Sequence, residues 1–220
     1  MPGRYRDTHP WPFYALRITT PRLELRVPDD EDIVELFEAA RAGIHPAGEM
    51  PFGIPWTDGI EEVGALERFA SFYWTMRGTL TAQDWSLPFA VASEGRIIGT
   101  QDVKAEDFAG SRSVSTGSWL TVSAQGRGLG VEMRAAVLHL AFAGLGALEA
   151  QTSAWHDNPA SQRVSLRLGY EHEGQQLLAR RGEPTPHLRY RLTREAWQRN
   201  HFDGIELHGL EQCLALLGAA

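Results

Sequence analysis

Short stretches in which apolar and polar residues alternate predict several β-strands along this chain. Leu23 and Leu25 are separated by charged residues, which is the two-residue repeat of a half-buried strand. Ser93 to Arg96 reads as a hairpin turn between two such stretches. The predicted strands lie within 16–27 and at 87–92, 97–103, 114–122, 147–154, 170–176 and 187–192. A turn is expected at 108–113.

Apolar residues at helical spacing predict helices between these strands. The first begins in the acidic run after Pro28, carries the apolar stripe of Ile33, Leu36 and Phe37, and ends at Gly43. The others are predicted at 58–76, 131–142 and 160–168, with one or two more after Arg194. Mixed strands and helices indicate one α/β domain over 16–194. An N-terminal arm over 1–15, on which Trp11, Phe13 and Tyr14 can dock, and a helical extension over 195–220 complete the chain.

A glycine-rich turn lies between the strand that ends at Val122 and the helix that begins at Val131. Glycine lets a ligand approach the backbone, and the amides at a new helix N-terminus attract anions. The sequence lacks the lysine of the Walker pattern, and the dinucleotide pattern fails at Val131. A glycine-rich turn without a ligand is the alternative. The predicted anion-binding residues are Gln125, Gly126, Arg127, Gly128, Leu129 and Gly130.

Composition narrows the functional class. The 220 residues are 43% hydrophobic and carry a net charge of −7, which argues against a non-specific nucleic-acid partner. One cysteine, Cys213, excludes an internal disulfide framework. No apolar run has the length of a membrane span, and no apolar segment follows Arg4 and Arg6 as in a secretory signal, so we expect a cytoplasmic protein. The eight histidines show no metal-binding spacing, and no metal is predicted.

Two motifs in order resemble those of one enzyme family. The pattern Gln125-x-x-Gly128-x-Gly130 is similar to the pyrophosphate loop of the GCN5-related N-acetyltransferase (GNAT) superfamily, which binds acetyl-CoA. The segment from Asn158 to Tyr170 resembles the family's second motif, and Thr20 to Arg26 resembles the first strand of its RimJ/RimL-like branch. The resemblance covers about residues 20 to 192.

The resemblance implies a fold and an activity. The fold is a central mixed, mostly antiparallel twisted sheet of about seven strands, splayed at the middle and flanked by helices. The activity is acyl-CoA-dependent N-acyltransfer, in which the amine of a protein N-terminus or small molecule attacks acetyl-CoA directly in a ternary complex. A CoA-binding module or sensor without turnover, and a transferase of a longer acyl group such as succinyl, are the alternatives. A homodimer is possible in this family.

The resemblance also assigns roles around the thioester. The free amide at about Val122 is expected to hold the pantetheine or the thioester oxygen. Many members protonate the leaving sulfur with a tyrosine, and Ser165 occupies that position here. In RimL-type enzymes a serine three residues after the asparagine takes this role, which points to Ser161. Asn158 is expected to hold the pantetheine amide. A helix cap is the alternative for both residues, and a hydrogen bond to the pantetheine is a further alternative for Ser161.

The acceptor side is less constrained by the motifs. The glutamate expected after the last motif aligns near Arg180, so this chain departs from the family pattern. The candidate bases are Glu49, Glu173, Glu183, Asp102 and His45. The proline-rich loop over 44–58 is unusually apolar, with Met50, Phe52, Ile54 and Trp56. We expect it to line the amine pocket with Glu49 facing a cationic amine; a structural lid and a seal between protomers are the alternatives.

Overall fold

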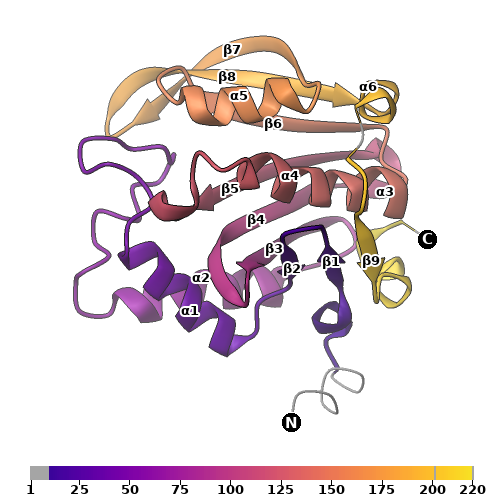
Figure 1. Cartoon of the computed structure of the whole chain (residues 1–220), viewed down its shortest axis with the longest axis horizontal. Helices are drawn as coiled ribbons and strands as arrows, with labels where there is room; N and C mark the ends of the chain where they lie inside the picture. Colours follow the sequence, from indigo (N-terminus) through magenta and orange to yellow (C-terminus); the bar gives the residue numbers. More distant parts are fainter. Residues whose placement is uncertain (1–9, 201, 220) are drawn as a thin grey trace.

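The computed structural model describes residues 10–200 and 202–219, in which nine strands form one sheet (Figure 1). Across the sheet the strands are β7 (Glu171–Arg180), β8 (Glu183–Thr193), β6 (Glu149–Trp155), β5 (Ser113–Leu120), β4 (Arg96–Glu106), β3 (Asp84–Ser93), β2 (Glu24–Arg26), β1 (Arg17–Thr19) and β9 (Glu206–His208). Every neighbouring pair is antiparallel except β5 and β6. The predicted mixed, mostly antiparallel sheet is confirmed, with two more strands than expected.

The two extra strands lie at one edge of the sheet. The stretch 16–27 was predicted to contain one strand, but it forms the hairpin of β1 and β2. Pro21 has no amide hydrogen, and the Thr20 amide donates to the Leu23 carbonyl to close the turn. The C-terminal segment is helical at α6 (Arg194–Arg199), as predicted, but it also contains β9, which pairs with β1 through Ile18 and Leu207.

Helices cover both faces of the sheet. Ile33 of α1 (Asp30–Arg41) and Tyr73 of α2 (Ala65–Thr79) pack with Ala90 of β3, whereas the adjacent Val91 packs with α4 (Leu129–His139). Adjacent strand residues point to opposite faces, so α1 and α2 cover one face and α4 covers the other. α5 (Pro159–Arg167) contacts α4 (Figure 1). The predicted turn at 108–113 contains α3 (Phe108–Ser111), a single helical turn.

Two predicted helix boundaries differ from the structure. The helix expected from residue 58 begins at Ala65, because Gly64 adopts a left-handed conformation with φ of 79° and residues 58–64 form turns. Val63, which falls within the expected helix, lies outside the observed one and is fully exposed. The helix expected at 131–142 begins earlier, at Leu129, and ends in a π-helical turn over Leu140–Gly144.

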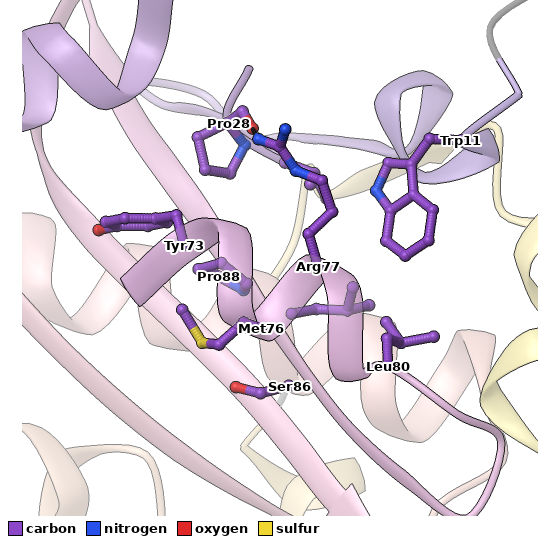
Figure 2. A pocket seen from close by; sticks show the side chains of 10 residues that line it. Trp11, Pro28, Tyr73, Met76, Arg77, Leu80, Ser86 and Pro88 are labelled. Carbon is purple, nitrogen blue, oxygen red and sulfur yellow. Dashed lines mark hydrogen bonds between the residues drawn. The ribbon is translucent and has the colours of Figure 1, made fainter. Parts of the chain in front are cut away.

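The arm is more ordered than its prolines suggest. Pro12–Ala15 form a 3₁₀ helix, and the side chain of Phe13 is fully buried in the core. Figure 2 shows a pocket between this segment, α2 and β3, lined by Trp11, Tyr73 and Arg77 among others. Residues 1–9 of the predicted arm lie outside the described residues. In the described part of the chain, no helix combines the length and the apolarity needed to cross a bilayer.

The C-terminal segment contributes side chains to the core. Leu217 has no exposed surface, and its carbonyl accepts a hydrogen bond from Trp85 Nε1 at 3.1 Å. We predict that Leu217→Ala lowers the free energy of unfolding by about 2–5 kcal/mol, the usual cost of a cavity in a core. Leu216, which is 40% exposed, is the matched control. Leu216→Ala should cost about 0.5 kcal/mol or less in urea denaturation. Equal effects of the two substitutions would mean that this segment is not part of the core.

Candidate functional site

The centre of the sheet opens where β5 and β6 part. The two strands pair in parallel from Ser113 and Glu149 to Thr116 and Thr152, and the ladder then stops. Beyond that point β5 continues to Leu120 along β4, and β6 continues along β8. Where two strands separate, the backbone N–H and C=O groups that face each other no longer form hydrogen bonds between the strands. The predicted splay at the middle of the sheet is therefore present.

The backbone amide that faces this gap is not the expected one. The Val122 amide was expected to be free, but it donates to the Gly43 carbonyl at 3.0 Å. The Thr121 amide donates to the Ile98 carbonyl at 2.8 Å, which places Leu120 in a non-hydrogen-bonded pair of the β4–β5 ladder. The backbone groups of Leu120 therefore point away from β4 and toward the gap. The Val122 amide is therefore not free as predicted, because the chain turns at Thr121.

The glycine-rich turn that follows has the geometry of an anion site. Gly126 and Gly128 have φ of 72° and 80°, which side chains rarely adopt, and Gly128 caps α4. Leu129 is buried and anchors the turn, whereas Arg127 is exposed. Among the described residues, no acceptor takes the backbone amides of 126–130. These amides and the helix N-terminus form a cradle that suits a pyrophosphate.

Gln125 has a different position from the rest of the loop. Its side-chain Nε2 donates to the carbonyls of Ile44 and Leu120, both at 2.9 Å. The side chain therefore joins the loop after α1 to the end of β5. A ligand can meet Gln125 through its backbone, whereas its side-chain amide is already bound to protein.

A buried carboxylate, Glu132, is linked through Arg22 to the glycine-rich turn, and the sequence analysis did not identify it. Glu132 in the first turn of α4 is 1% exposed and accepts hydrogen bonds from Thr20 Oγ1 at 2.7 Å and from Arg22 Nε at 2.6 Å. Arg22 Nη1 donates in turn to the Arg127 carbonyl at 3.1 Å. The β1–β2 turn therefore holds the glycine loop through one ion pair. The signal in the sequence was the Thr20 to Arg26 segment itself, which served only to identify the family branch.

The second motif forms the N-terminus of α5, beside the gap. Asn158 caps the helix, because its Oδ1 accepts from the Ser161 amide at 3.1 Å. Ser161 is half-buried, and within the described residues its hydroxyl has no hydrogen-bond partner. Ser165, at the position where many relatives have tyrosine, is fully buried and points away from the gap's opening into the contact with α4.

The apolar loop after α1 lies on the other face of β5. Met50 is buried, and the rings of Phe52 and Trp56 lie 5.3 Å apart, with Trp56 6.2 Å from Trp119 on β5. The loop therefore packs on the sheet next to the gap. Glu49 is exposed, as the acceptor-side hypothesis requires.

The tip of the β7–β8 hairpin lies beside this loop (Figure 1), and two of its arginines hold the loop in place. Arg180 contacts both carboxylate oxygens of Asp157, at 2.9 and 2.6 Å, and donates to the Met50 carbonyl at 3.1 Å. These hydrogen bonds lower the pKa of Asp157. Arg181 pairs with Asp58 at 2.6 Å. Arg180, the position that aligns near the expected glutamate, thus forms an ion pair between the β7–β8 hairpin and the entry to α5.

The other candidate bases differ in their surroundings. The Asp102 carboxylate accepts the Gly117 amide on β5, and burial raises its pKa despite that hydrogen bond. His45 Nε2 lies 2.9 Å from Thr57 Oγ1. Glu173 and Glu183 are exposed on the β7–β8 hairpin. Among residues 10–200 and 202–219, no three His, Cys, Asp or Glu side chains gather in a potential metal site.

Comparisons with known proteins agree with this geometry. The family model described as "Acetyltransferase (GNAT) domain" matches residues 22–171. Mycobacterium smegmatis RimJ, in complex with CoA-disulfide, superposes with a TM-score of 0.71 at 19% identity over 93% of this chain and 95% of that one. The RimL ribosomal L7/L12 alpha-N-protein acetyltransferase, in complex with coenzyme A, superposes with a TM-score of 0.66 at 18% identity, over 80% of this chain and 97% of that one. The ribosomal-protein-S5-alanine acetyltransferase of Vibrio fischeri superposes with a TM-score of 0.64 at 19% identity, over 82% of this chain and 98% of that one. At these identities the structures show a shared fold.

The Glu132 carboxylate offers a test of how the loop is held. We predict that Glu132→Gln lowers the free energy of unfolding by about 1–3 kcal/mol, because charge-assisted hydrogen bonds to Arg22 are lost in a buried position. Hydrogen exchange of the amides at positions 131 and 132, which both donate to the Gly128 carbonyl at 3.2 Å, should rise, since Arg22 then releases the Arg127 carbonyl and loosens the turn. Glu35 on α1 is exposed, and Glu35→Gln is the control that should change neither quantity. If Glu132→Gln is less stable but its amide exchange is unchanged, the ion pair stabilises the fold without holding the glycine-rich turn.

Proposed function

The chain belongs to the acetyltransferase (GNAT) domain family and is an N-acetyltransferase, and from that premise we propose that it transfers acetyl from acetyl-CoA to a primary amine in a ternary complex. The observation that carries the proposal is the row of unpaired amides at 126–130 beside the gap between β5 and β6. The cradle takes the pyrophosphate, with the exposed Arg127 adding positive charge. The pantetheine then enters the gap, where the Leu120 backbone and the Asn158 side chain offer hydrogen bonds.

The chemistry requires one bond to form and one to break. The amine nitrogen attacks the thioester carbonyl, the C–S bond breaks, and the CoA thiolate takes a proton while the new amide nitrogen loses one. We assign the proton donor to Ser161, whose hydroxyl has no hydrogen-bond partner among residues 10–200 and 202–219. Ser161 regains its proton from solvent. The ammonium proton leaves toward the acceptor side, where we keep two candidate bases: the exposed Glu49, and Asp102, whose pKa is raised by burial.

The acceptor enters from the face that α1, α2 and the apolar loop cover. Phe52 and Trp56 supply an apolar wall beside β5, and the exposed Glu49 attracts a positively charged amine. Protein N-termini are the first acceptors to test, because the similar structures include enzymes named for the ribosomal proteins L7/L12 and S5. Small-molecule amines and longer acyl groups such as succinyl are the further candidates.

A CoA-binding module without turnover is the second candidate function. Two departures from the family pattern favour it: Ser165 replaces the tyrosine acid, and Arg180 takes the aligned place of the glutamate and pairs with Asp157. Release of free thiol from acetyl-CoA distinguishes the two, measured with N-terminal peptides and small amines as acceptors. Thiol release by the wild-type protein, with a higher KM for the acceptor in the Glu49→Gln variant, supports the enzyme. Tight CoA binding with no thiol release from any acceptor supports the module.

The glycine loop provides the test of the co-substrate site. We predict that Gly128→Glu abolishes CoA binding measured by calorimetry, because the carboxylate repels the pyrophosphate and the side chain fills the cradle. Gly64 is a matched control: it caps α2 with φ of 79°, and an arginine nitrogen lies 3.5 Å from the position that a Cβ would take, as at Gly128. Both substitutions should cost about 1–2 kcal/mol of stability for the left-handed conformation. Undiminished affinity in folded Gly128→Glu rules out the loop as the site.

Ser161 is tested by separating kcat from binding. We predict that Ser161→Ala lowers kcat by about 10²-fold, the usual contribution of a positioned general acid. The affinity for CoA should change little, because one neutral hydrogen bond contributes only about 1 kcal/mol. Steady-state kinetics and calorimetry on the same preparation provide both numbers. A raised KM with kcat intact would make Ser161 a binding residue and leave water as the acid.

A further inference from the structure

A buried arginine lies behind the gap, and none of the roles assigned above uses it. Arg134 on α4 is 3% exposed. Its Nη1 donates to Ser165 Oγ on α5 at 3.0 Å, and its Nη2 donates to Ser118 Oγ on β5 at 3.1 Å. One guanidinium therefore bonds to two of the elements that border the gap, from a helix that borders it as well.

The surroundings of Arg134 are unusual for a buried cation. No ion pair among the described residues includes it, and both of its partners are neutral hydroxyl groups. Its Nε is buried with no hydrogen-bond partner in the described chain. Burial lowers the pKa of Arg134, as expected for a cation removed from water. The charges of Tyr170 and Asp102 oppose this shift, but neither residue forms an ion pair with Arg134 among the described residues. A buried cation that is hydrogen-bonded only to neutral hydroxyl groups destabilises a fold relative to an apolar residue of similar size. Its presence here points to a role other than stability.

The hydrogen bonds of Arg134 lead to the proposed acid. Ser165 Oγ accepts from Arg134 and donates to the Ser161 carbonyl at 3.1 Å, so its hydroxyl is oriented by both neighbours. The first turn of α5, which carries Ser161, is thereby fixed relative to α4. Ser118 lies two residues beyond Thr116, where β5 leaves β6, so the second hydrogen bond fixes the open part of β5.

We propose that Arg134 is a positioning residue for acyl transfer, which holds Ser161 and the free segment of β5 at a fixed separation across the gap. The inference rests on the proposed function for its kinetic consequence. The acid on α5 and the Leu120 backbone on β5 must both reach the same thioester. A displacement of about 1 Å in either can cost on the order of 10²-fold in rate. A guanidinium suits this task because its planar fork bonds two partners in a fixed geometry.

The test compares variants that remove the link with variants that keep it. Arg134→Met combined with Ser165→Ala removes the buried charge together with its hydroxyl partner, a change that leaves stability near that of wild type. Arg134→Lys retains the charge without the fork. Arg163 on α5 is exposed, and Arg163→Met is the matched control. For each variant we measure thermal unfolding, CoA affinity, kcat and KM, and hydrogen exchange over 159–162, where Ala160, Ser161 and Gln162 carry the amides.

The double variant should bind CoA as wild type does, lose about 10²-fold in kcat, and exchange faster over 159–162. The kcat of Arg134→Lys should lie between that of wild type and that of the double variant. In a Ser161→Ala background the same double substitution should cause a smaller further loss of kcat than in wild type, because part of its effect acts through Ser161. Ser165→Ala alone repeats the test if the double variant does not fold.

Two results overturn the inference. One is a folded double variant with wild-type kcat. The other is a double substitution that lowers kcat by the same factor in the Ser161→Ala background as in wild type, because the two effects would then be independent. Failure of the proposed function is distinguishable, because wild-type protein would then release no thiol from acetyl-CoA with any acceptor. In that case hydrogen exchange still tests the link, and unchanged exchange over 159–162 refutes it.

Discussion

The parting of β5 from β6 is the constraint on which the rest of this structure depends. A sheet is stable because neighbouring strands satisfy each other's backbone groups, and here the ladder stops at Thr116 and Thr152. The remaining strand edges must be held by other means. On one face α4 and α5 cover the opening, and on the other the apolar loop packs on Trp119. The gap is therefore framed on both faces by elements from distant parts of the sequence.

Polar contacts rather than apolar packing align these elements at the gap. Glu132 and Arg22 join the β1–β2 turn to the glycine loop, and Arg134 joins α4 to α5 and β5. Hydrogen bonds to charged groups are directional, so they set orientation more narrowly than apolar contact does. The pair of Arg180 and Asp157 differs in kind, because Asp157 is half exposed and solvent screens such a pair. Its structural effect comes through the bond from Arg180 to the Met50 carbonyl.

In the proposed reaction, each face of the gap binds one of the two substrates. The glycine loop and the start of α5 present amides and hydroxyls toward one side, where an anionic, polar co-substrate fits. The loop after α1 presents Phe52 and Trp56 with the exposed Glu49, which suits an apolar segment that ends in a cation. A reaction in which an amine meets a thioester directly needs both to reach the same opening at once. The splayed sheet provides that opening without a change of fold.

The sequence alone determined the local elements and the motifs at their ends. The glycine loop and the α5 block could be predicted because Gly126, Gly128 and Asn158 act through their own backbone or the nearest turn. Tertiary structure decided the rest. The amide that faces the gap is that of Leu120 instead of Val122, because strand register against β4 sets it. The β9 strand and the link from Arg134 to Ser165 each join residues far apart in the chain. Local periodicity carries no information about such partners, since their pairing depends on how the whole chain packs.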